Sequence, residues 1–372
     1  RWREKGFMIW QGDRAMGPAS SADLDDPRMI AQYGEYSNVP GARATRTSIT
    51  DPERFGRLSA DGWDAPALWI KSRNNWVSTR HARYDAATGT LHFDRVNHEG
   101  RGATYALLNH PDLLDRPGEW VISPRAGTIR VVTHEAADPN AAELRYTDVN
   151  LGVGGGRASH VAIRGLVIEG TLRFAMWLGK RGGGGRVSDI RIEDSAVIRA
   201  GAIRFTEAED VTVEGTRFLD VTKLRPLFLD DVRRARVAFN DFRRTRSGLT
   251  LYEGVDSLVL GNRVRETLDV HGNAMTVYKA SHGTWIVGNR LDSGRAGLGL
   301  TLRNSNDLLI AFNIFRGRQY AMAQWAPRSR KKGNRLAIYN NTFLGSVFMQ
   351  PGTVRRSAYL NNFAGALEVK GA

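Results

Sequence analysis

The sequence contains no cysteine among its 372 residues, and it has no long hydrophobic run. Without cysteine the chain can form neither a disulfide framework nor a thiolate nucleophile. No segment approaches the roughly 20 consecutive apolar residues of a transmembrane helix. Proline is also scarce, at 12 residues, whereas glycine is abundant, at 40. This balance is typical of a chain that turns often yet stays ordered, and a hydrophobic content of 41% is enough for a substantial core.

Negative charge is in deficit as well, because 39 Asp and Glu residues accompany 53 Lys and Arg residues, for a net charge of +14. A basic surface attracts polyanions such as nucleic acid, acidic polysaccharide or anionic lipid, although a general preference for arginine explains the excess equally well. The basic residues are dispersed, apart from the run RSRKK at 328–332, which is too short and isolated for a nucleic-acid-binding arm. We therefore expect no nucleic-acid partner and no membrane partner.

The second half of the chain repeats a short unit. Each copy has a turn in which a polar residue comes two positions before a large apolar residue, and successive copies are 21 to 30 residues apart. An alternating segment precedes each turn, for example VTV at 211–213 and LVL at 258–260, and period-two alternation predicts a half-buried strand. Strand repeats of this length, without amphipathic helices, predict a parallel β-helix.

Asparagine recurs at the polar position of these turns. In stacked coils, equivalent positions lie about 4.8 Å apart along the axis, and asparagine tolerates a left-handed backbone while its amide bonds to its neighbours. We therefore predict that the asparagines form an internal ladder with a structural role. They are Asn240, Asn262, Asn289, Asn313, Asn341 and Asn362.

The first 158 residues lack the repeat. They show short strands and loops with several tryptophans, namely Trp63, Trp69, Trp76 and Trp120. The glycine-rich segment LGVGGGR at 151–157 is interpreted as a linker into the first coil, because it lacks the strand–loop–helix setting of a phosphate-binding loop. We predict a β-rich N-terminal capping region over residues 1–158 and a solenoid over residues 159–372.

Two features resemble known protein families. The repeat over 159–372 resembles the right-handed parallel β-helix proteins of the pectate-lyase-like superfamily, a scaffold that carries many functions. The stretch LDRPGEW at 114–120, followed by RAGTI at 125–129, is similar to a segment that precedes the coils in β-helix glycosidases, among them retaining β-xylosidases and family 141 enzymes. These resemblances imply an all-β fold, a right-handed parallel β-helix, carbohydrate-active chemistry and a structural role for Glu119.

A second strand follows each turn, and its outward positions collect chemically active residues. Inward apolar pairs such as Leu227 and Leu229 leave the alternate side chains on the outer face. Carboxylates, phenols and cations converge there, which favours a glycan-binding active site over an ordinary charged surface. The outward rows are Arg204, Phe228, Thr250, Thr276 and Thr301; then Thr206, Asp230, Tyr252, Tyr278 and Arg303; and, at the strand ends, Glu207, Asp231, Glu253, Lys279 and Asn304.

Asp230 and Glu253 are 23 residues apart, which is one coil. Adjacent coils place such side chains about 5 Å apart, a separation that suits retaining glycoside hydrolysis. The strands LFLDD at 227–231 and LTLYE at 249–253 are similar to the nucleophile and acid/base strands of retaining β-helix xylosidases. That resemblance implies Asp230 as the nucleophile and Glu253 as the acid/base, and a slip of one residue would make Asp231 the partner.

A polysaccharide lyase that acts on a uronic acid polymer is the second hypothesis. β-Elimination needs a cation to hold the carboxylate and a base near the C5 proton. The carboxylate of Glu253 beside Lys279 favours the charged form of the lysine, which is not a base. Tyr278 or His271 would then be the base. The groups available for these roles are Tyr278, Lys279, His271 and Arg303. The third hypothesis is a non-catalytic carbohydrate-binding or tail-spike-like adhesion module, which would not need the carboxylates.

The predicted partner is a polysaccharide or oligosaccharide, acidic under the lyase hypothesis. Trp325 is a candidate for stacking on a sugar ring, whereas Trp285 is expected to pack inside a core strand.

No cofactor is predicted: His and Cys show no metal-ligand spacing, although calcium bound by Asp and Glu is left open. The sequence begins at Arg1 rather than Met, which a removed signal peptide would explain, and the predicted location is secreted or periplasmic. The predicted substrate-binding residues are Arg204, Tyr252, His271, Tyr278, Lys279, Arg303 and Trp325.

Overall fold

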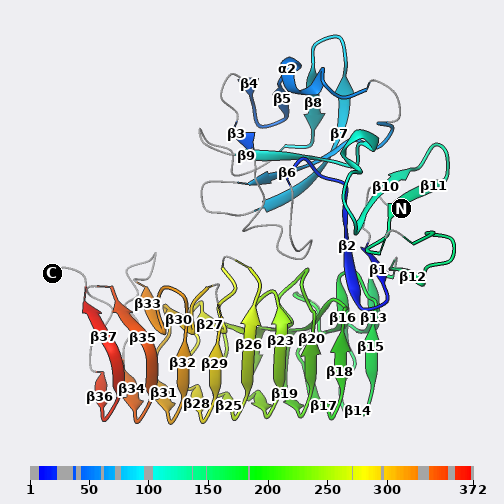
Figure 1. Ribbon diagram of the computed structural model, residues 1–372. Coiled ribbons are helices and arrows are strands. Elements are labelled where there is room, and N and C mark those ends of the chain that lie inside the picture. Colours follow the sequence, from blue (N-terminus) through cyan, green and yellow to red (C-terminus); the bar gives the residue numbers. More distant parts are fainter. Residues whose placement is uncertain are drawn as a thin grey trace. The chain divides into compact units, whose positions relative to one another are not determined.

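The chain divides into two compact units, Arg1–Asp148 and Val149–Ala372. Both consist almost entirely of β-structure (Figure 1). The computed structural model describes residues 8–22, 37–38, 43–59, 63–71, 77–95, 104–135, 137–147, 149–182, 185–269, 271–294, 297–325, 335–350 and 357–369. Trp76 and the basic run at 328–332 lie outside the described residues.

The described residues of unit 1 form two sheets in which most neighbouring strands are antiparallel. Their strand orders are β11-β10-β2-β1-β12 and β3-β9-β6-β7-β8-β5-β4. The short helix α2 (Pro52–Phe55) begins at Asp51, whose carboxylate accepts the Arg54 N–H, and a 3-10 turn spans Pro111–Leu113. The strands are β1 (Met8–Gln11), β2 (Arg14–Pro18), β3 (Ser37–Asn38), β4 (Arg43–Ala44), β5 (Ser48–Thr50), β6 (Ala67–Lys71), β7 (Val77–Asp85), β8 (Thr90–Phe93), β9 (Thr104–Leu108), β10 (Glu119–Ser123), β11 (Thr128–Val132) and β12 (Leu144–Thr147).

The segment after β9 has a structural role in unit 1. Asn109 has a left-handed backbone, with φ at 61°, and its side chain accepts the Ile122 N–H and donates to the carbonyl of Ala65. The Glu119 carboxylate accepts the backbone N–H of Arg116 at 3.2 Å, which closes the turn before β10. The structural role expected for Glu119 therefore agrees with its contacts.

His110 is fully buried beside this turn. Its Nδ1 accepts the backbone N–H of Asp112 at 3.0 Å, so its other ring nitrogen carries the proton and donates to the carbonyl of Ser59 at 3.1 Å. The ring also lies edge-on to Trp63, with centroids 5.1 Å apart. Burial lowers the pKa of His110, although Ser59 and Asp112 act in the opposite direction. The neutral imidazole therefore fits both partners, and a second proton would displace the Asp112 N–H.

We predict that unit 1 loses stability as the pH falls below about 6.5, the ordinary pKa of histidine. The pKa of His110 is lowered in the folded state, so the unfolded chain binds the proton more readily and acid favours unfolding. Thermal unfolding of the whole chain, followed by circular dichroism between about pH 7.5 and about pH 5.5, measures this effect. His110→Gln should flatten the pH dependence. Equal slopes for wild type and His110→Gln would contradict the prediction.

Unit 2 is a parallel β-solenoid, as predicted from the repeats. Its strands recur in three columns, which we call A, B and C, and each coil contributes one strand to each column (Figure 1). Column A contains β13 (Leu151–Gly155), β16 (Phe174–Leu178), β19 (Ala202–Glu214), β21 (Leu227–Arg233), β24 (Leu249–Tyr252), β27 (Met275–Tyr278), β30 (Leu300–Arg303) and β33 (Met322–Trp325).

Columns B and C complete each coil. Column B contains β14 (Val161–Arg164), β17 (Val187–Glu193), β22 (Arg236–Ala238), β25 (Leu258–Leu260), β28 (Trp285–Val287), β31 (Leu308–Ala311), β34 (Leu336–Tyr339) and β36 (Ala358–Leu360), and the long β19 continues into it. Column C contains β15 (Val167–Glu169), β18 (Ala196–Ile198), β20 (Arg217–Leu219), β23 (Asp241–Thr245), β26 (Arg263–Thr267), β29 (Arg290–Asp292) and β32 (Ile314–Arg316). β35 (Thr342–Met349) and β37 (Phe363–Val369) run from column C into column A.

The inward side chains of the three columns form one continuous core. The column A pairs predicted to point inward, such as Leu227 with Leu229 and Met275 with Val277, are almost completely buried. Phe218 and Phe242 stack from adjacent coils with ring centroids 4.5 Å apart. Burial of such a side chain contributes about 1.5–3 kcal/mol. The core therefore holds each column A strand in register with the next.

The predicted asparagine ladder is confirmed. The Oδ1 atom of each asparagine accepts both the backbone N–H and the amide Nδ2 of the asparagine one coil earlier; for Asn289 and Asn262 these distances are 2.8 and 3.0 Å. Asn240 begins the series and accepts the N–H of Thr216. The same pattern continues through Asn313, Asn341 and Asn362.

Two expectations about unit 2 are wrong. The segment at 151–157 is not a linker: it contains β13, which pairs in parallel with β16 and begins the solenoid. Glycine suits this strand because a Cβ at Gly152 would lie 2.6 Å from the carbonyl oxygen of Ala175. Trp285 does not pack in the core either, because in β28 the inward residue is Ile286 and the Trp285 side chain is 57% exposed.

Candidate active site

The outer surface of column A, which we call the column A face, carries the predicted site residues in two rows. The strands align in the register expected from the sequence, so each residue lies beside its equivalent one coil away, about 4.8 Å along the axis. One row contains Trp177, Arg204, Phe228, Thr250, Thr276 and Thr301, and the other contains Thr206, Asp230, Tyr252, Tyr278, Arg303 and Trp325.

Asp230, in the middle of β21, is held by two arginines. Its Oδ2 accepts from Nη2 of Arg204 at 2.8 Å, and its Oδ1 accepts from Nη2 of Arg181 at 3.2 Å. The Asp230 side chain is only 6% exposed, so these ion pairs offset the loss of its hydration. The two contacts also fix the plane of the carboxylate.

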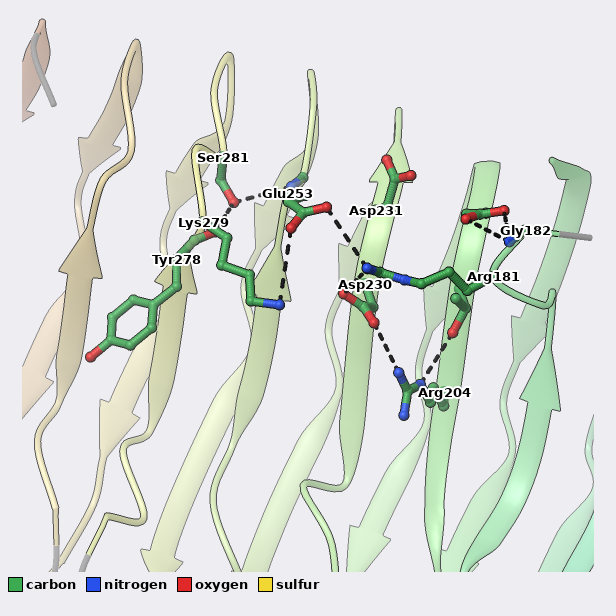
Figure 2. Close-up of polar contacts among 12 residues, drawn as sticks. Arg181, Gly182, Arg204, Asp230, Asp231, Glu253, Tyr278, Lys279 and Ser281 are labelled. Atoms are coloured by element: carbon green, nitrogen blue, oxygen red, sulfur yellow. Dashed lines mark hydrogen bonds and ion pairs between the residues drawn. The ribbon is translucent and has the colours of Figure 1, made fainter. Parts of the chain in front are cut away.

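Glu253 lies one coil further on, immediately after β24, and its side chain is 40% exposed. The Nη2 atom of Arg181 that contacts Asp230 is also 3.8 Å from Oε2 of Glu253, and Nζ of Lys279 is 4.0 Å from Oε1 (Figure 2). Because both oxygens contact one nitrogen, the two carboxylates approach within about 7 Å, inside the range that paired glycosidase carboxylates span. Asp230 and Glu253 therefore share one site.

Asp231 does not join this pair. It lies within β21, at the position equivalent to Glu253, and has a left-handed backbone, with φ at 58°, as Glu253 has at 52°. Its Oδ1 accepts from Nη2 of Arg186 at 2.7 Å, and Figure 2 shows its carboxylate directed away from Arg181. The contacts therefore favour Asp230, rather than Asp231, as the partner of Glu253.

An aromatic stack lies beside the carboxylates. The rings of Tyr252 and Tyr278 are stacked, with centroids 5.9 Å apart and planes 5° apart, and Phe228 meets Tyr252 edge-on at 5.1 Å. Arg225 donates from Nη1 to the Tyr252 hydroxyl at 2.6 Å, and Nζ of Lys279 lies 4.7 Å from the centre of the same ring. Stacked phenols with polar edges suit the mixed apolar and hydroxyl surface of a sugar ring.

The stack extends along the face through Thr301. Its Oγ1 is 3.0 Å from the hydroxyl of Tyr278 and accepts from Nε1 of Trp325 at 3.1 Å. Burial raises the pKa of Tyr278, whereas Arg303 and Arg225 act in the opposite direction. Tyr278 is therefore protonated near neutral pH and is a hydrogen-bond donor rather than a base.

His271 is separated from the carboxylates. It lies in the turn before β27, and its backbone N–H donates to Oδ1 of Asp269 at 3.1 Å. Glu253 directly follows β24, at the opposite, carboxyl end of that strand, and Asp230 is in register with Tyr252, the last residue of β24. A strand of four residues, about 13 Å long, separates His271 from the level of the carboxylates, and its contact with the substrate stays a prediction.

A comparison with known protein families identifies the solenoid. The family model described as "Periplasmic copper-binding protein (NosD)" matches residues 159–352, more than half of the chain. This chain belongs to the NosD family. The match confirms the β-helix part of the predicted resemblance, and the narrower likeness to β-xylosidases and family 141 enzymes stays a prediction. The periplasmic description of the NosD family also agrees with the secreted or periplasmic location predicted from the sequence.

A solved structure titled "Glycoside hydrolase" is similar to this NosD-family chain, with a TM-score of 0.41 and 12% sequence identity. The similarity covers 97% of this chain and 76% of the other. No protein with a curated description matches the sequence. None of the helices in the described residues has the length and hydropathy that a membrane-spanning helix needs.

Three arginines of the candidate site were not predicted from the sequence. Arg181 and Arg186 come from the segment between β16 and β17, and Arg225 comes from the segment before β21. Each reaches a residue on a later coil, so the pairing does not follow from strand alternation. The only signal in the sequence is that these segments flank column A strands, which places any long side chain in them near the same face.

Proposed function

We propose that the column A face binds a saccharide and hydrolyses a glycosidic bond in it, with Asp230 and Glu253 as the reacting carboxylates. The observation that carries this proposal is the position of Arg181, whose single Nη2 atom contacts both carboxylates from adjacent coils. Two carboxylates at such a separation, beside stacked tyrosines, are the arrangement that glycoside hydrolysis uses.

The two carboxylates differ in exposure, which assigns their roles in the proposal. Glu253, the more exposed, donates a proton to the leaving oxygen. Asp230, oriented by Arg204 and Arg181, attacks the anomeric carbon and forms a covalent glycosyl intermediate. Glu253 then removes a proton from a water molecule, whose oxygen attacks the anomeric carbon and breaks its bond to Asp230, which releases the sugar.

Elimination by a lyase is less well supported, because it needs a base. Burial keeps Tyr278 protonated, and His271 lies at the other end of β27. Lys279 is 4.0 Å from Glu253, so its ammonium group is already engaged in an ion pair with that carboxylate. None of the three bases considered from the sequence therefore suits proton abstraction on this face.

The description of the NosD family raises copper as a ligand for this chain. Copper binds sulfur and imidazole donors, and the sequence has no cysteine. Among the described residues, no group of three or more His, Asp or Glu side chains is arranged to hold a metal ion. The carboxylates of the column A face pair with arginines, whose positive charge opposes a cation. The described His, Asp and Glu side chains therefore do not form a site that fits copper.

Product analysis tests the proposed reaction. We expect the purified chain, incubated with a panel of polysaccharides, to release reducing ends without any rise in the absorbance of unsaturated uronides. The reason is that hydrolysis adds water across the bond, whereas elimination leaves a C4–C5 double bond. An absorbance rise that matches the reducing ends would contradict hydrolysis, and binding without cleavage would favour an adhesion module.

A further inference from the structure

Most arginines of unit 2 that are not fully exposed pair with a carboxylate, often from the preceding coil. Examples are Arg199 with Glu169 and Arg244 with Asp220. Among the described arginines of unit 2 without such a pair, all but two are exposed. The exposed ones are Arg157, Arg173, Arg217, Arg233, Arg263, Arg290 and Arg318.

The two exceptions, Arg225 and Arg303, are both half-buried and both lie on the column A face. Within the part of the chain that the structure describes, neither pairs with a carboxylate. Arg225 donates one hydrogen bond, to Tyr252, and lies over the rings of Phe228 and Tyr252. Arg303 is the strand neighbour of Tyr278. A half-buried guanidinium group has lost hydration without gaining an anion, which is costly unless a ligand supplies one.

A second observation points to a ligand at the same place. Thr250, next to Phe228 and Thr276 in the first outward row, is 1% exposed, and its Oγ1 has no hydrogen-bond partner. Nε1 of Trp177, in the same row, is also buried without a partner. Buried polar atoms are nearly always hydrogen-bonded. Both lie on outward positions, where a bound molecule could supply the missing partner.

We infer that the saccharide bound on the column A face is anionic, and that Arg225 and Arg303 bind its carboxylate or sulfate groups on either side of the Tyr252–Tyr278 stack. This inference takes the location of the binding site from the proposed function, but it does not depend on the proposed hydrolysis. Strand register puts Tyr252 and Arg303 two coils apart, about 10 Å along the axis. Two cationic positions at that spacing suit a chain that carries repeated negative groups better than a single small anion.

Arginine is suited to this role because its planar guanidinium group presents parallel N–H donors to a carboxylate or sulfate. Lys279 adds a third cation beside the stack, although it also contacts Glu253. The tyrosines would then contact the sugar rings, and the two arginines the acidic groups. Neutral glycans would leave both guanidinium groups without an anion, so the face would discriminate against them.

Binding measurements with matched variants test this inference. The probes are immobilised glycans bearing uronate or sulfate groups, and the same uronate glycans after methyl esterification. We expect wild type to bind acidic glycans and to lose at least about 10-fold in affinity for the esterified forms. Arg225→Gln and Arg303→Gln should each weaken acidic-glycan binding by a similar factor. Arg290→Gln, which removes the same charge from column C, should change it less than about 2-fold.

The inference is overturned if esterified glycans bind as tightly as acidic ones, if no acidic glycan binds, or if Arg225→Gln and Arg303→Gln behave like Arg290→Gln. Cleavage by wild type is measured on the same glycans, which separates the two proposals. An acidic glycan bound through the arginines but never cleaved would support the inference and contradict the proposed hydrolysis. Cleavage of neutral glycans that neither arginine variant affects would support the proposed hydrolysis and contradict the inference.

Discussion

Asp230→Asn and Glu253→Gln should each lower kcat/KM by at least about 100-fold on the glycan that the product analysis identifies. Each substitution keeps the shape of the side chain and removes the ionisable group that the proposed chemistry needs. Asp230→Asn removes the negative charge that attacks the anomeric carbon. Glu253→Gln removes the proton that is donated to the leaving oxygen. Steady-state kinetics on purified variants measures the loss.

The matched control for this prediction is Asp231→Asn. Asp231 is adjacent in sequence and opposite Glu253 in the coils, but its carboxylate pairs with Arg186 instead of Arg181. We expect its activity to stay within about 5-fold of wild type, because the variant keeps a hydrogen-bond acceptor for Arg186. If Asp231→Asn were as inactive as Asp230→Asn, the assignment of the reacting pair would be wrong.

Asn289→Ala should destabilise the solenoid by at least about 3 kcal/mol. The Asn289 side chain accepts from the backbone and the amide of Asn262, and it donates to Asn313 and to the carbonyl of Val259. All of these groups are buried, so truncation leaves several without partners and opens a cavity. Urea unfolding followed by circular dichroism measures the change in the free energy of unfolding.

Asn362→Ala is the control for the ladder prediction. Asn362 makes the same contacts to Asn341, at 2.9 and 3.0 Å, and donates to the carbonyl of Ile338 at 2.8 Å. It is only partly buried, so water can replace the lost partners, and we expect less than half the destabilisation of Asn289→Ala. Equal losses at the two positions would mean that the ladder contributes by packing rather than by hydrogen bonds.

The fold and the outward rows were predictable because they follow from local alternation. In strands such as LTLY at 249–252 the apolar residues occupy every second position, so the face of Tyr252 is fixed once Leu249 and Leu251 point inward. The recurring asparagine fixed the register between coils in the same way. Alternation failed for Trp285, because in Trp285-Ile286-Val287 apolar residues occupy both faces and the pattern does not choose between them.

The partners of the carboxylates could not be predicted by the same reasoning. Arg181 and Arg186 lie outside the strands, and their guanidinium groups reach Asp230 and Asp231 two coils later, 49 and 45 residues along the chain. No sequence period links such positions, because side-chain reach and the path of the connecting segment decide the contact. The glycines at 152–155 led to the wrong prediction of a linker for a related reason. A strand whose backbone lies close to its neighbours is rich in glycine, and its sequence then resembles that of a flexible linker.

The most direct test of the central claim is a crystal structure of the Glu253→Gln variant with the glycan that the product analysis identifies. We predict that the sugar lies along the column A face, against Tyr252 and Tyr278. The glycosidic oxygen should be within hydrogen-bond distance of residue 253, and the anomeric carbon should face Asp230. A glycan bound on column B or C, or one on column A whose nearest glycosidic bond is out of reach of both side chains, would contradict the claim.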